Sequence, residues 1–354
     1  EATLKRAVDL GFHHVETARH YGSSERQLGW ALPRTPDPSR LLQSKVPPRP
    51  DPDDFEAELE LSFERLGCDR LDLLAIHGIN LPEHLEQTLQ PGGCMEVVRR
   101  WQAKGRIGHV GFSTHGPTAL IAQACDSGAF DYVNLHWYYI RQDNGPALDA
   151  ARRQDMGVFI ISPTDKGGHL HTPSQRLLEL CAPLHPIVFN DLFCLQDPRV
   201  HTISVGAARP EDLELHLEAL RLLPEAASLI APVDQRLRQA ADEALGRDWM
   251  ATWSVGLPPW HATPGEINLP VLLWLYNLLE AWDLESYAKA RYGLLGSGGH
   301  WFAGANADGF EDEVSVEELQ SVLQESPWRE RIPEILRSLK QRLKGESQMR
   351  LSSV

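Results

Sequence analysis

Short apolar runs alternate with amphipathic stretches along the first two thirds of the chain. The runs are rich in β-branched residues and favour strands, whereas the stretches between them carry apolar residues at the spacing of one helix face. A strand followed by a helix, repeated along the chain, is typical of a parallel sheet with crossover helices. The predicted strands are His14–Ala18, Leu41–Val46, Leu71–His77, Ile107–Ser113, Tyr132–His136, Gly157–Ser162 and Thr202–Gly206.

Several helical stretches between these strands begin with Asp or Pro, which helix starts favour. The helical stretches predicted between the strands include Asp54–Leu66, Gly93–Lys104, Pro117–Ser127 and Pro210–Leu222. This rhythm predicts an α/β fold of the (β/α)₈ TIM barrel type. A closed barrel needs eight strands, and helical spacing already begins at Leu4 with no initiator Met before it. We therefore expect the first strand of the barrel to lie upstream of Glu1.

The rhythm stops near Ala231, after which the pattern predicts helices only. They cover Gln235–Leu245, Val271–Tyr287, Val316–Glu325 and Ile332–Gly345. Most of the ten Trp residues lie in this part, and such aromatic clusters fill small cores. We therefore expect two domains, a barrel over residues 1–230 and a helical, Trp-rich domain over residues 231–354. The apolar stretch Leu269–Leu279 is too short to span a bilayer, so we interpret it as a buried helix.

Charge and cysteine content restrict the function classes. The formal net charge of −15 disfavours nucleic acid and membrane partners, because both are bound by clustered Lys and Arg. A nucleotide cofactor stays compatible, because backbone N–H groups at a helix start can bind phosphate within an acidic protein. The five Cys are scattered without a CxxC pair, and an odd number argues against a disulfide framework. A reducing, cytoplasmic location is therefore expected.

Polar side chains follow the predicted strands at their carboxyl ends, where a barrel of this class carries its function. They are Glu16, Tyr21, Lys45, His77, Ser113, Asn134, Ser162 and Asp165. Taken singly, Lys45 fits a solvated strand-end lysine, Tyr21 a loop aromatic and His77 a hydrogen-bonded core histidine. Taken together, titratable groups gathered at one end of a barrel indicate proton-transfer chemistry.

The order of the motifs adds a resemblance to a known family. GFHHVETARHYGSSERQLGWAL at residues 11–32 resembles the signature of the aldo/keto reductases. QSKV, LDLLAIHG and GRIGHVGFST resemble the family's next strands in order and spacing, and GVFIISPTDKGG and ISVGAARPEDLELHL resemble its last two strands with their nucleotide-facing loops. The match covers roughly residues 1–220 and rests on several ordered motifs rather than on one.

The resemblance implies an NAD(P)H-dependent oxidoreductase that reduces an aldehyde or ketone, with a small-molecule carbonyl compound as its substrate. Hydride transfer to a carbonyl leaves an alkoxide, so the site needs an acid beside the carbonyl oxygen. By resemblance Tyr21 is that acid, Lys45 favours its phenolate form, and His77 orients the carbonyl. The family holds this lysine with an aspartate, whereas the chain has Glu16. One extra methylene in such a site is compatible with weak activity.

The resemblance also assigns cofactor contacts, with NADPH slightly favoured over NADH. Ser113, Thr114 and Asn134 take the places that bind the nicotinamide carboxamide, although the family has Asn and Gln at the second and third. The remaining contacts are Tyr138 against the nicotinamide ring, Ser162 and Asp165 beside the pyrophosphate, and Gly206, Ala207 and Arg209 before a phosphate-binding helix start. Where many relatives have an Arg for a 2′-phosphate this chain has Asp212, and Arg209 could substitute.

The C-terminal part resembles the ferredoxin-like domain that follows the barrel in one branch of the family. TPGEINLP at residues 263–270 has the shape of that domain's last cysteine motif, but Thr263 stands in the cysteine position. Cluster iron needs thiolate ligands, and no Cys follows Cys194. We therefore expect no iron–sulfur cluster, and a role for this domain in packing, substrate gating or binding a protein partner.

Other function classes stay open at this point. A nucleotide-binding sensor or scaffold with little catalysis is compatible with Glu16 and the missing cysteines. A barrel that no longer binds the cofactor is compatible with Thr114, Asn134 and Asp212. The fifteen His raise the possibility of a zinc hydrolase, but they are spread over different strands and loops, so no metal site is expected.

Overall fold

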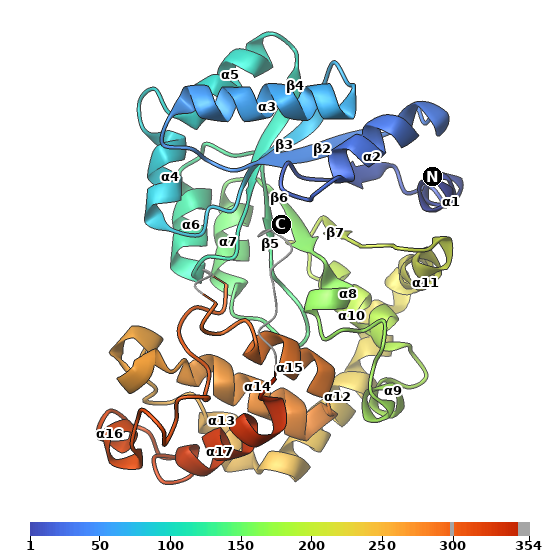
Figure 1. Cartoon of the computed structure of the whole chain (residues 1–354). Helices are drawn as coiled ribbons and strands as arrows, with labels where there is room; N and C mark the ends of the chain where they lie inside the picture. The colour runs from blue at the N-terminus through green and yellow to red at the C-terminus, as the bar shows by residue number, and fades with distance from the viewer. Residues whose placement is uncertain (298–300, 346–354) are drawn as a thin grey trace. The chain divides into compact units, whose positions relative to one another are not determined.

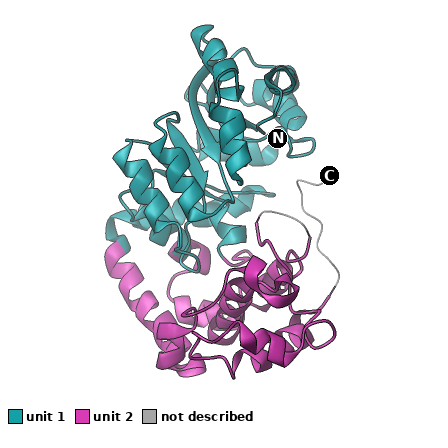
Figure 2. Ribbon diagram, turned by 90° about the vertical axis from the view of Figure 1, so that its left-hand side faces the viewer, with its two compact units in different colours: residues 1–167, 190–226, 351–354 teal, residues 168–189, 227–350 magenta. Residues whose placement is uncertain are grey.

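The computed structural model describes residues 1–297 and 301–345, and the chain divides into two compact units (Figures 1 and 2). Unit 1 holds residues 1–167 and 190–226. Unit 2 holds residues 168–189 and the described residues from 227 onward. Residues 168–189 therefore belong with the C-terminal part of the chain, although they precede the expected boundary at residue 230.

Unit 1 is built on seven parallel strands, each hydrogen-bonded to its neighbour in sequence. They are β1 (His14–Glu16), β2 (Leu41–Val46), β3 (Leu71–His77), β4 (Ile107–Ser113), β5 (Tyr132–Leu135), β6 (Gly157–Ile161) and β7 (Thr202–Ser204). All seven predicted strands are confirmed, and four of them end one or two residues earlier than predicted. Helices connect consecutive strands, and the sheet forms the nearly closed (β/α)₈-type barrel that the sequence predicts. The strand expected before Glu1 stays a prediction.

One helix of unit 1 shows how the sequence sets its ends. α3 (Pro52–Leu66) begins after Asp51, whose side chain accepts a hydrogen bond from the backbone N–H of Asp53. It ends at Gly67, which adopts the left-handed conformation with φ 60°. The other helices of this unit are α1 (Ala2–Asp9), α2 (Ser24–Ala31), α4 (Pro82–Leu89), α5 (Cys94–Ala103), α6 (Thr118–Asp126), α7 (Gly145–Arg153), α8 (Pro163–Lys166), the 3₁₀ turn η2 (Pro210–Leu213) and α11 (Glu214–Leu222).

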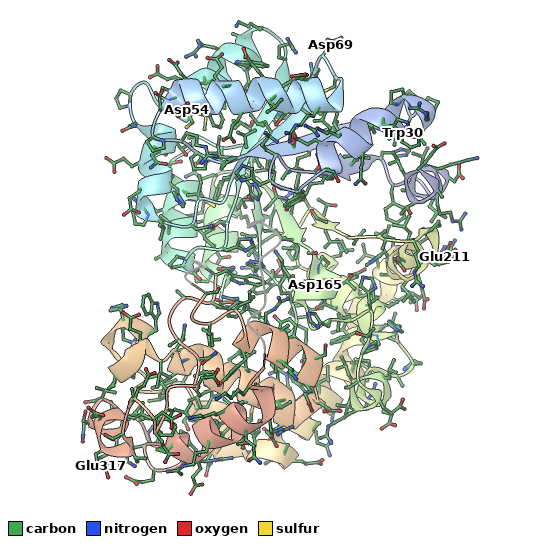
Figure 3. All side chains as sticks on the ribbon, viewed as in Figure 1. Trp30, Asp54, Asp69, Asp165, Glu211 and Glu317 are labelled. Carbon is green, nitrogen blue, oxygen red and sulfur yellow. The ribbon has the colours of Figure 1, made fainter. Side chains whose placement is uncertain are left out.

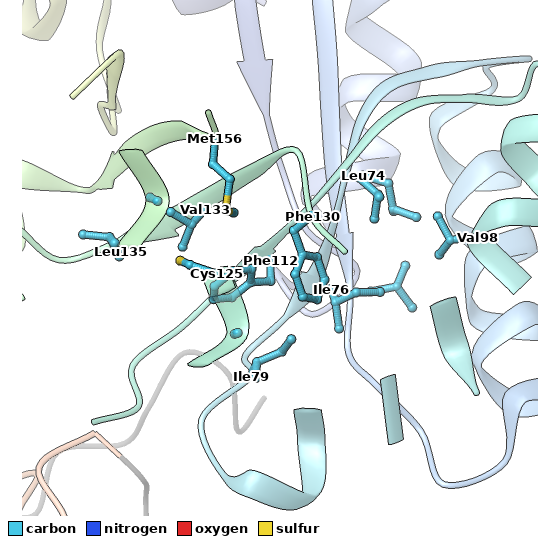
Figure 4. Close-up of a cluster of buried hydrophobic side chains, with 14 of the residues drawn as sticks. Leu74, Ile76, Ile79, Val98, Phe112, Cys125, Phe130, Val133, Leu135 and Met156 are labelled. Carbon is cyan, nitrogen blue, oxygen red and sulfur yellow. The ribbon is translucent and has the colours of Figure 1, made fainter. Parts of the chain in front are cut away.

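The core of unit 1 lies between the strands and the helices that cover them. Leu74, Ile76 and Phe112 are fully buried, and the rings of Phe112 and Phe130 pack with centroids 4.8 Å apart (Figure 4). Burying one such side chain contributes about 1.5–3 kcal/mol. This packing supports a fixed strand register, in which His77 pairs with Ser113 and Ser113 with Asn134. The residues at the carboxyl ends of the strands are thereby held at fixed relative positions.

Unit 2 consists of helices joined by turns. They are α9 (Gln175–Cys181), α12 (Ala226–Leu245), α13 (Arg247–Thr252), α14 (Leu269–Trp282), α15 (Glu285–Tyr292), α16 (Val316–Ser321) and α17 (Ile332–Leu343), and α10 (Pro186–Leu195) runs from unit 2 into unit 1. The expected buried helix is α14, capped by Asn268. The continuous helix predicted for Val271–Tyr287 is wrong in extent, because the chain leaves the helix at Asp283 with φ 56°.

Side-chain hydrogen bonds attach residues 168–189 to the rest of unit 2. The Ser174 hydroxyl donates to the carbonyl of Trp282 at 2.9 Å, and Arg176 Nε donates to the carbonyl of Ala281 at 2.7 Å. Arg236 Nε donates to the carbonyl of Leu180 at 2.9 Å. The segment is therefore hydrogen-bonded to both α12 and α14. Within the described ranges no single helix is long and apolar enough to cross a bilayer, while the bent pair α9 and α10 meets that test by length and composition.

Candidate active site

The three side chains expected to carry proton transfer meet at the carboxyl end of the barrel. Lys45 Nζ lies 5.0 Å from the centroid of the Tyr21 ring, and the rings of Tyr21 and His77 meet edge to face with centroids 5.6 Å apart. Lys45 is buried at the end of β2, whereas Tyr21 is 44 % exposed. The Tyr21 side chain is therefore accessible to solvent, while the ammonium beside it is shielded from water.

Glu16 and Lys45 form a buried ion pair, with Oε1 and Nζ 2.5 Å apart. Burial by itself would raise the pKa of Glu16 and lower that of Lys45, because it disfavours both charges. Their mutual attraction and hydrogen bond outweigh burial, so the pKa of Glu16 lies below and that of Lys45 above its ordinary value. Both groups are therefore charged at neutral pH.

The length of Glu16 lets its second oxygen reach groups on other strands. Oε2 accepts hydrogen bonds from the Ser204 hydroxyl at 2.8 Å and from Asn134 Nδ2 at 3.2 Å. Asn134 Oδ1 in turn accepts from Gln43 Nε2 at 3.0 Å. The carboxylate thus links β1, β2, β5 and β7 inside the barrel.

Gln43 and Ser204 are site residues that the sequence reasoning missed. Gln43 lies two residues before Lys45 on β2, so strand alternation places both side chains on the same face. A polar residue two positions before Lys45 on the same predicted strand was a signal that could have identified it. Ser204 belongs to a three-residue strand, too short to show an alternating pattern.

His77 is a neutral group in this site. Burial is the main cause that lowers its pKa to about 3, and the nearby charges of Lys45 and His20 contribute to the same shift. A neutral imidazole can donate or accept a hydrogen bond at a carbonyl oxygen, but it cannot supply a proton near neutral pH.

The three residues expected at the nicotinamide carboxamide differ in their hydrogen-bond partners within the protein. Ser113 Oγ accepts from the backbone N–H of Gly78 at 3.1 Å, and this bond leaves the hydroxyl hydrogen to be donated elsewhere. The Thr114 hydroxyl donates to the carbonyl of Ile79 at 2.7 Å and so fixes the loop after β3. Asn134 is fully buried and engaged with Glu16. Ser113 is the one of the three whose geometry fits the expected contact.

Tyr138 is placed differently from the expected stacking residue. Its side chain is 1 % exposed, and its hydroxyl donates to the carbonyl of Ile161. A ring enclosed in this way has no open face for a nicotinamide ring. The structure therefore does not bring Tyr138 to the surface of the site.

The residues expected near the cofactor phosphates lie after β6 and β7. Ser162 turns the chain with φ 48°, and Asp165 lies on α8 directly after it (Figure 3). Gly206 leaves room beside the chain, since an added Cβ there would meet nothing within 4 Å. Gly206 and Ala207 precede η2. The donors at the start of η2 are bonded by the Asp212 side chain, which also pairs with Arg209.

Asp212 occupies the start of η2. Its Oδ2 accepts hydrogen bonds from the backbone N–H groups of Ala208 at 3.0 Å and Arg209 at 2.9 Å. Its Oδ1 accepts from the Arg209 guanidinium at 2.9 Å. The carboxylate thus takes the amide and guanidinium donors that a phosphate would use. The backbone bond from Arg209 is the main cause that holds the pKa of Asp212 below its ordinary value.

In unit 2, Thr263 supports the turn that the expected cysteine motif would occupy. Its hydroxyl lies 2.6 Å from the carbonyl oxygen of Trp260 and 2.7 Å from that of Ile267. The single hydroxyl hydrogen can be donated to either carbonyl and so supports the turn. Over residues 1–297 and 301–345, no group of three or more His, Cys, Asp or Glu is arranged to hold a metal ion. The absence of an iron–sulfur cluster stays a prediction, which iron and sulfide analysis would test.

Comparison with known proteins identifies a family and relatives that are named as a dehydrogenase and a reductase. The aldo/keto reductase family profile matches residues 1–185. D-threo-aldose 1-dehydrogenase from Pseudomonas sp is 29% identical over 274 residues, covering 61% of this chain and 82% of that protein. L-glyceraldehyde 3-phosphate reductase from Escherichia coli (strain K12) is 20% identical over 297 residues, covering 67% and 83%.

A solved structure agrees with the fold. Aldo-keto reductase AKR11C1 from Bacillus halodurans, in its holo form, superposes with a TM-score of 0.57 at 17% identity and covers 66% of this chain and 85% of its own. The family profile spans more than half of the chain and contains Glu16, Tyr21, Lys45 and His77. The chain therefore belongs to the aldo/keto reductase family and is an oxidoreductase.

Proposed function

We propose that the protein reduces an aldehyde or ketone by hydride transfer from NAD(P)H, with Tyr21 as the general acid. The observation that supports this most is the placement of a charged, buried Lys45 against the ring of an exposed Tyr21. A phenol beside a fixed ammonium can lose its proton, because the ammonium stabilises the phenolate that remains. The direction of the proton is then from Tyr21 to the oxygen of the substrate.

Each residue of the site has one task in this reaction. A bound nicotinamide dinucleotide supplies the hydride. Tyr21 donates a proton to the carbonyl oxygen as negative charge develops there, and neutral His77 hydrogen-bonds the same oxygen and orients it. Glu16 keeps Lys45 charged and in place. Ser113 is suited to bind an amide group of the cofactor, because its hydroxyl hydrogen is not used in accepting from Gly78.

The cofactor is proposed to be NADPH, with NADH as the competitor. Arg209 is the N-cap residue of η2, the helical turn after β7, but Asp212 already pairs with it. The strength of this pair therefore sets the preference between the two nucleotides. The proposed substrates are hydroxylated aldehydes, in keeping with relatives named for an aldose and for glyceraldehyde 3-phosphate.

The test of the acid is the variant Tyr21→Phe. We expect it to abolish turnover of aldehydes while tryptophan fluorescence still reports NADPH binding with a Kd within about twofold of the parent protein. The matched control is Tyr276→Phe, which removes a phenol hydroxyl in unit 2. Turnover that survives in Tyr21→Phe would show that another group is the acid.

A second candidate is a nucleotide-binding sensor with little catalysis. The observation that favours it is the commitment of Asn134 to Glu16 and Gln43, which removes one expected cofactor contact. Such a protein would bind NADPH or NADH tightly and oxidise neither when offered a series of aldehydes. If any aldehyde oxidises bound NADPH in a single-turnover experiment, the protein is an enzyme and the sensor hypothesis is wrong.

A further inference from the structure

A series of side-chain hydrogen bonds runs from the start of β1 to the carboxylate of Glu16. His14 Nε2 lies 2.8 Å from Gln43 Oε1, and Gln43 Nε2 lies 3.0 Å from Asn134 Oδ1. Asn134 Nδ2 lies 3.2 Å from Glu16 Oε2. We call His14, Gln43 and Asn134 the amide chain, because two of its three members are side-chain amides. It ends on the oxygen of Glu16 that is not paired with Lys45.

The parallel strands bring the members of the amide chain together. His14 and Glu16 are two residues apart on β1, so strand alternation points both side chains to the same side. Gln43 and Lys45 are related in the same way on β2, and the register pairs Glu16 with Gln43. Gln43 and Asn134 are fully buried, and a buried amide is costly without hydrogen-bond partners. The chain therefore satisfies two buried amides and ends on the carboxylate of the proposed proton-transfer set.

The chemistry of Glu16 fixes the direction of every bond in the amide chain. Its carboxylate is charged and can only accept, so the NH₂ group of Asn134 must face it and the Asn134 carbonyl oxygen must face Gln43. That oxygen also only accepts, which turns the NH₂ group of Gln43 toward Asn134 and the Gln43 carbonyl oxygen toward His14. His14 must then carry a hydrogen on Nε2 and donate it. Every bond of the chain thus donates toward Glu16.

Donors aimed at a carboxylate stabilise its charged form and hold it in one orientation. The Ser204 hydroxyl adds a second donor to the same oxygen of Glu16, at 2.8 Å. Two other titratable groups lie near this carboxylate. Burial is the main cause that lowers the pKa of His14, while burial and then the charge of Glu16 raise the pKa of Tyr132, so both groups are neutral at neutral pH. Lys45 is therefore the charged partner of Glu16 in this network.

We propose that Gln43 is a positioning residue for proton donation by Tyr21. Through the amide chain it directs one oxygen of Glu16 toward β5, while the other oxygen holds Lys45 against the Tyr21 ring. This inference rests on the proposed function and gives Asn134 a part in proton transfer in place of the expected nicotinamide contact. Without Gln43, the Asn134 amide can rotate and present its carbonyl oxygen to Glu16, which repels the carboxylate. Lys45 is then held less firmly, and the phenolate of Tyr21 is stabilised less.

The direction of the amide chain can be tested without turnover. Long-range ¹H–¹⁵N spectra of histidine-labelled protein distinguish the two tautomers of a neutral imidazole, and the His14 resonances are assigned by their loss in His14→Phe. At pH 7.5 we expect His14 to carry its hydrogen on Nε2 and none on Nδ1. The opposite tautomer would overturn the proposal, because Gln43 would then present its NH₂ group to His14 and its carbonyl oxygen to Asn134.

The positioning role is tested in Gln43→Met, which keeps the approximate size of the side chain and removes its amide. We expect kcat for the reduction of glyceraldehyde to fall about tenfold, with KM for glyceraldehyde and Kd for NADPH within about twofold of the parent values. The pH at which kcat/KM falls to half on the alkaline side should rise by about half a unit or more, because the phenolate is stabilised less. Gln239→Met makes the same change at an exposed position of α12 and should keep the parent values. Parent kinetics in Gln43→Met would overturn the proposal.

A pair of variants at His14 separates hydrogen bonding from packing. The His14 ring meets the Phe159 ring edge to face, with centroids 5.5 Å apart. His14→Phe keeps an aromatic ring but has no donor for Gln43, whereas His14→Gln loses the ring and keeps an N–H donor. We expect kcat to fall about threefold in His14→Phe and to stay nearer the parent value in His14→Gln. The reverse order would show that His14 acts by packing and would contradict its place in the amide chain.

The two proposals fail in different ways. A parent protein that oxidises NADPH with no aldehyde contradicts the proposed function, and the positioning role of Gln43 in that reaction falls with it. The tautomer of His14 then still decides whether the amide chain is directed toward Glu16. A parent protein that is active, together with unchanged kinetics in Gln43→Met, contradicts the positioning role alone.

Discussion

A buried lysine is costly unless its charge is compensated, and Lys45 is compensated by a single carboxylate. Glu16 also accepts hydrogen bonds from Asn134 and Ser204. One side chain therefore neutralises the charge of Lys45 and connects the strands inside the barrel. The extra methylene of Glu16 relative to Asp therefore has a visible use. It lets one oxygen bond Lys45 while the other reaches β5 and β7.

Removing the charge of Glu16 should destabilise the protein. In Glu16→Gln the Lys45 ammonium stays buried without a counter-charge, so we expect the free energy of unfolding to fall by about 3–5 kcal/mol. Urea unfolding at neutral pH measures it. Glu60→Gln makes the same chemical change at an exposed position of α3 and should alter stability by less than about 0.5 kcal/mol. Equal effects of the two variants would contradict the compensating role of Glu16.

Acid should destabilise the protein through His77. Its folded-state pKa of about 3 lies below the ordinary value of 6.5, so below pH 6.5 the unfolded chain binds a proton that the folded protein does not. Stability is then full above pH 6.5 and declines toward pH 3, by at most about 1.4 kcal/mol per pH unit from this group. Urea unfolding between pH 7.5 and about 5 should show a shallower decline in His77→Gln. An equal decline would assign the effect to other groups.

Elements differ in how well the sequence specifies them. The strands were predictable because β-branched runs are bounded by turns, and strand order then brought Tyr21, Lys45 and His77 to one end. The break between α14 and α15 was not predictable from the apolar pattern. It depends on Asp283, which adopts a left-handed conformation that is uncommon outside Gly. The bonds among Gln43, Asn134 and Glu16 were also hidden, since they join strands far apart in sequence.

The start of η2 should control the choice between the two nucleotides. In Asp212→Asn the negative charge is lost and Arg209 is released, so we expect NADPH affinity to rise about tenfold relative to NADH. Titration of each nucleotide by tryptophan fluorescence measures the ratio. Glu211→Gln removes a charge from the neighbouring exposed position (Figure 3) and should change the ratio much less. The same rise in both variants would indicate a general charge effect.

Two glycines should separate folding from cofactor binding. A Cβ on Gly111 would lie 2.5 Å from the Tyr132 ring and from its backbone, so Gly111→Ala should lower the free energy of unfolding by about 1–3 kcal/mol. A Cβ on Gly206 meets nothing within 4 Å, so Gly206→Ala should fold as the parent does. A loss of nucleotide affinity in Gly206→Ala alone would place the cofactor against this loop, and parent affinity would remove Gly206 from the site.

At the scale of the whole molecule, the two units are joined by more than one crossing of the chain. The chain passes from unit 1 to unit 2 after residue 167, returns at residue 190, and leaves again after residue 226. The buried side chains Leu177 and Cys181 of the first excursion belong to unit 2. A cut near residue 230 therefore leaves part of unit 2 attached to unit 1.

A fragment of residues 1–230 should fold poorly. Its segment 168–189 would lose the partners it has on α12 and α14, exposing Leu177 and three unpaired polar groups. We expect aggregation in size-exclusion chromatography. A second fragment, residues 1–226 with 168–189 replaced by a flexible Gly/Ser linker, should elute as a smaller, less aggregated species. Monodisperse behaviour of the first fragment would show that the segment needs no support from unit 2.

The repeated passage of the chain between its two units also limits how such a protein can arise and be rebuilt. A terminal module can be gained, lost or exchanged by joining two reading frames at one point. Here an exchange of unit 2 would have to replace an internal stretch and a distal one together, and the two would have to match each other. Residues 168–189 and the later helices are therefore expected to vary as a pair among variants that still fold, and shuffling libraries should recover hybrids only when both stretches come from the same parent.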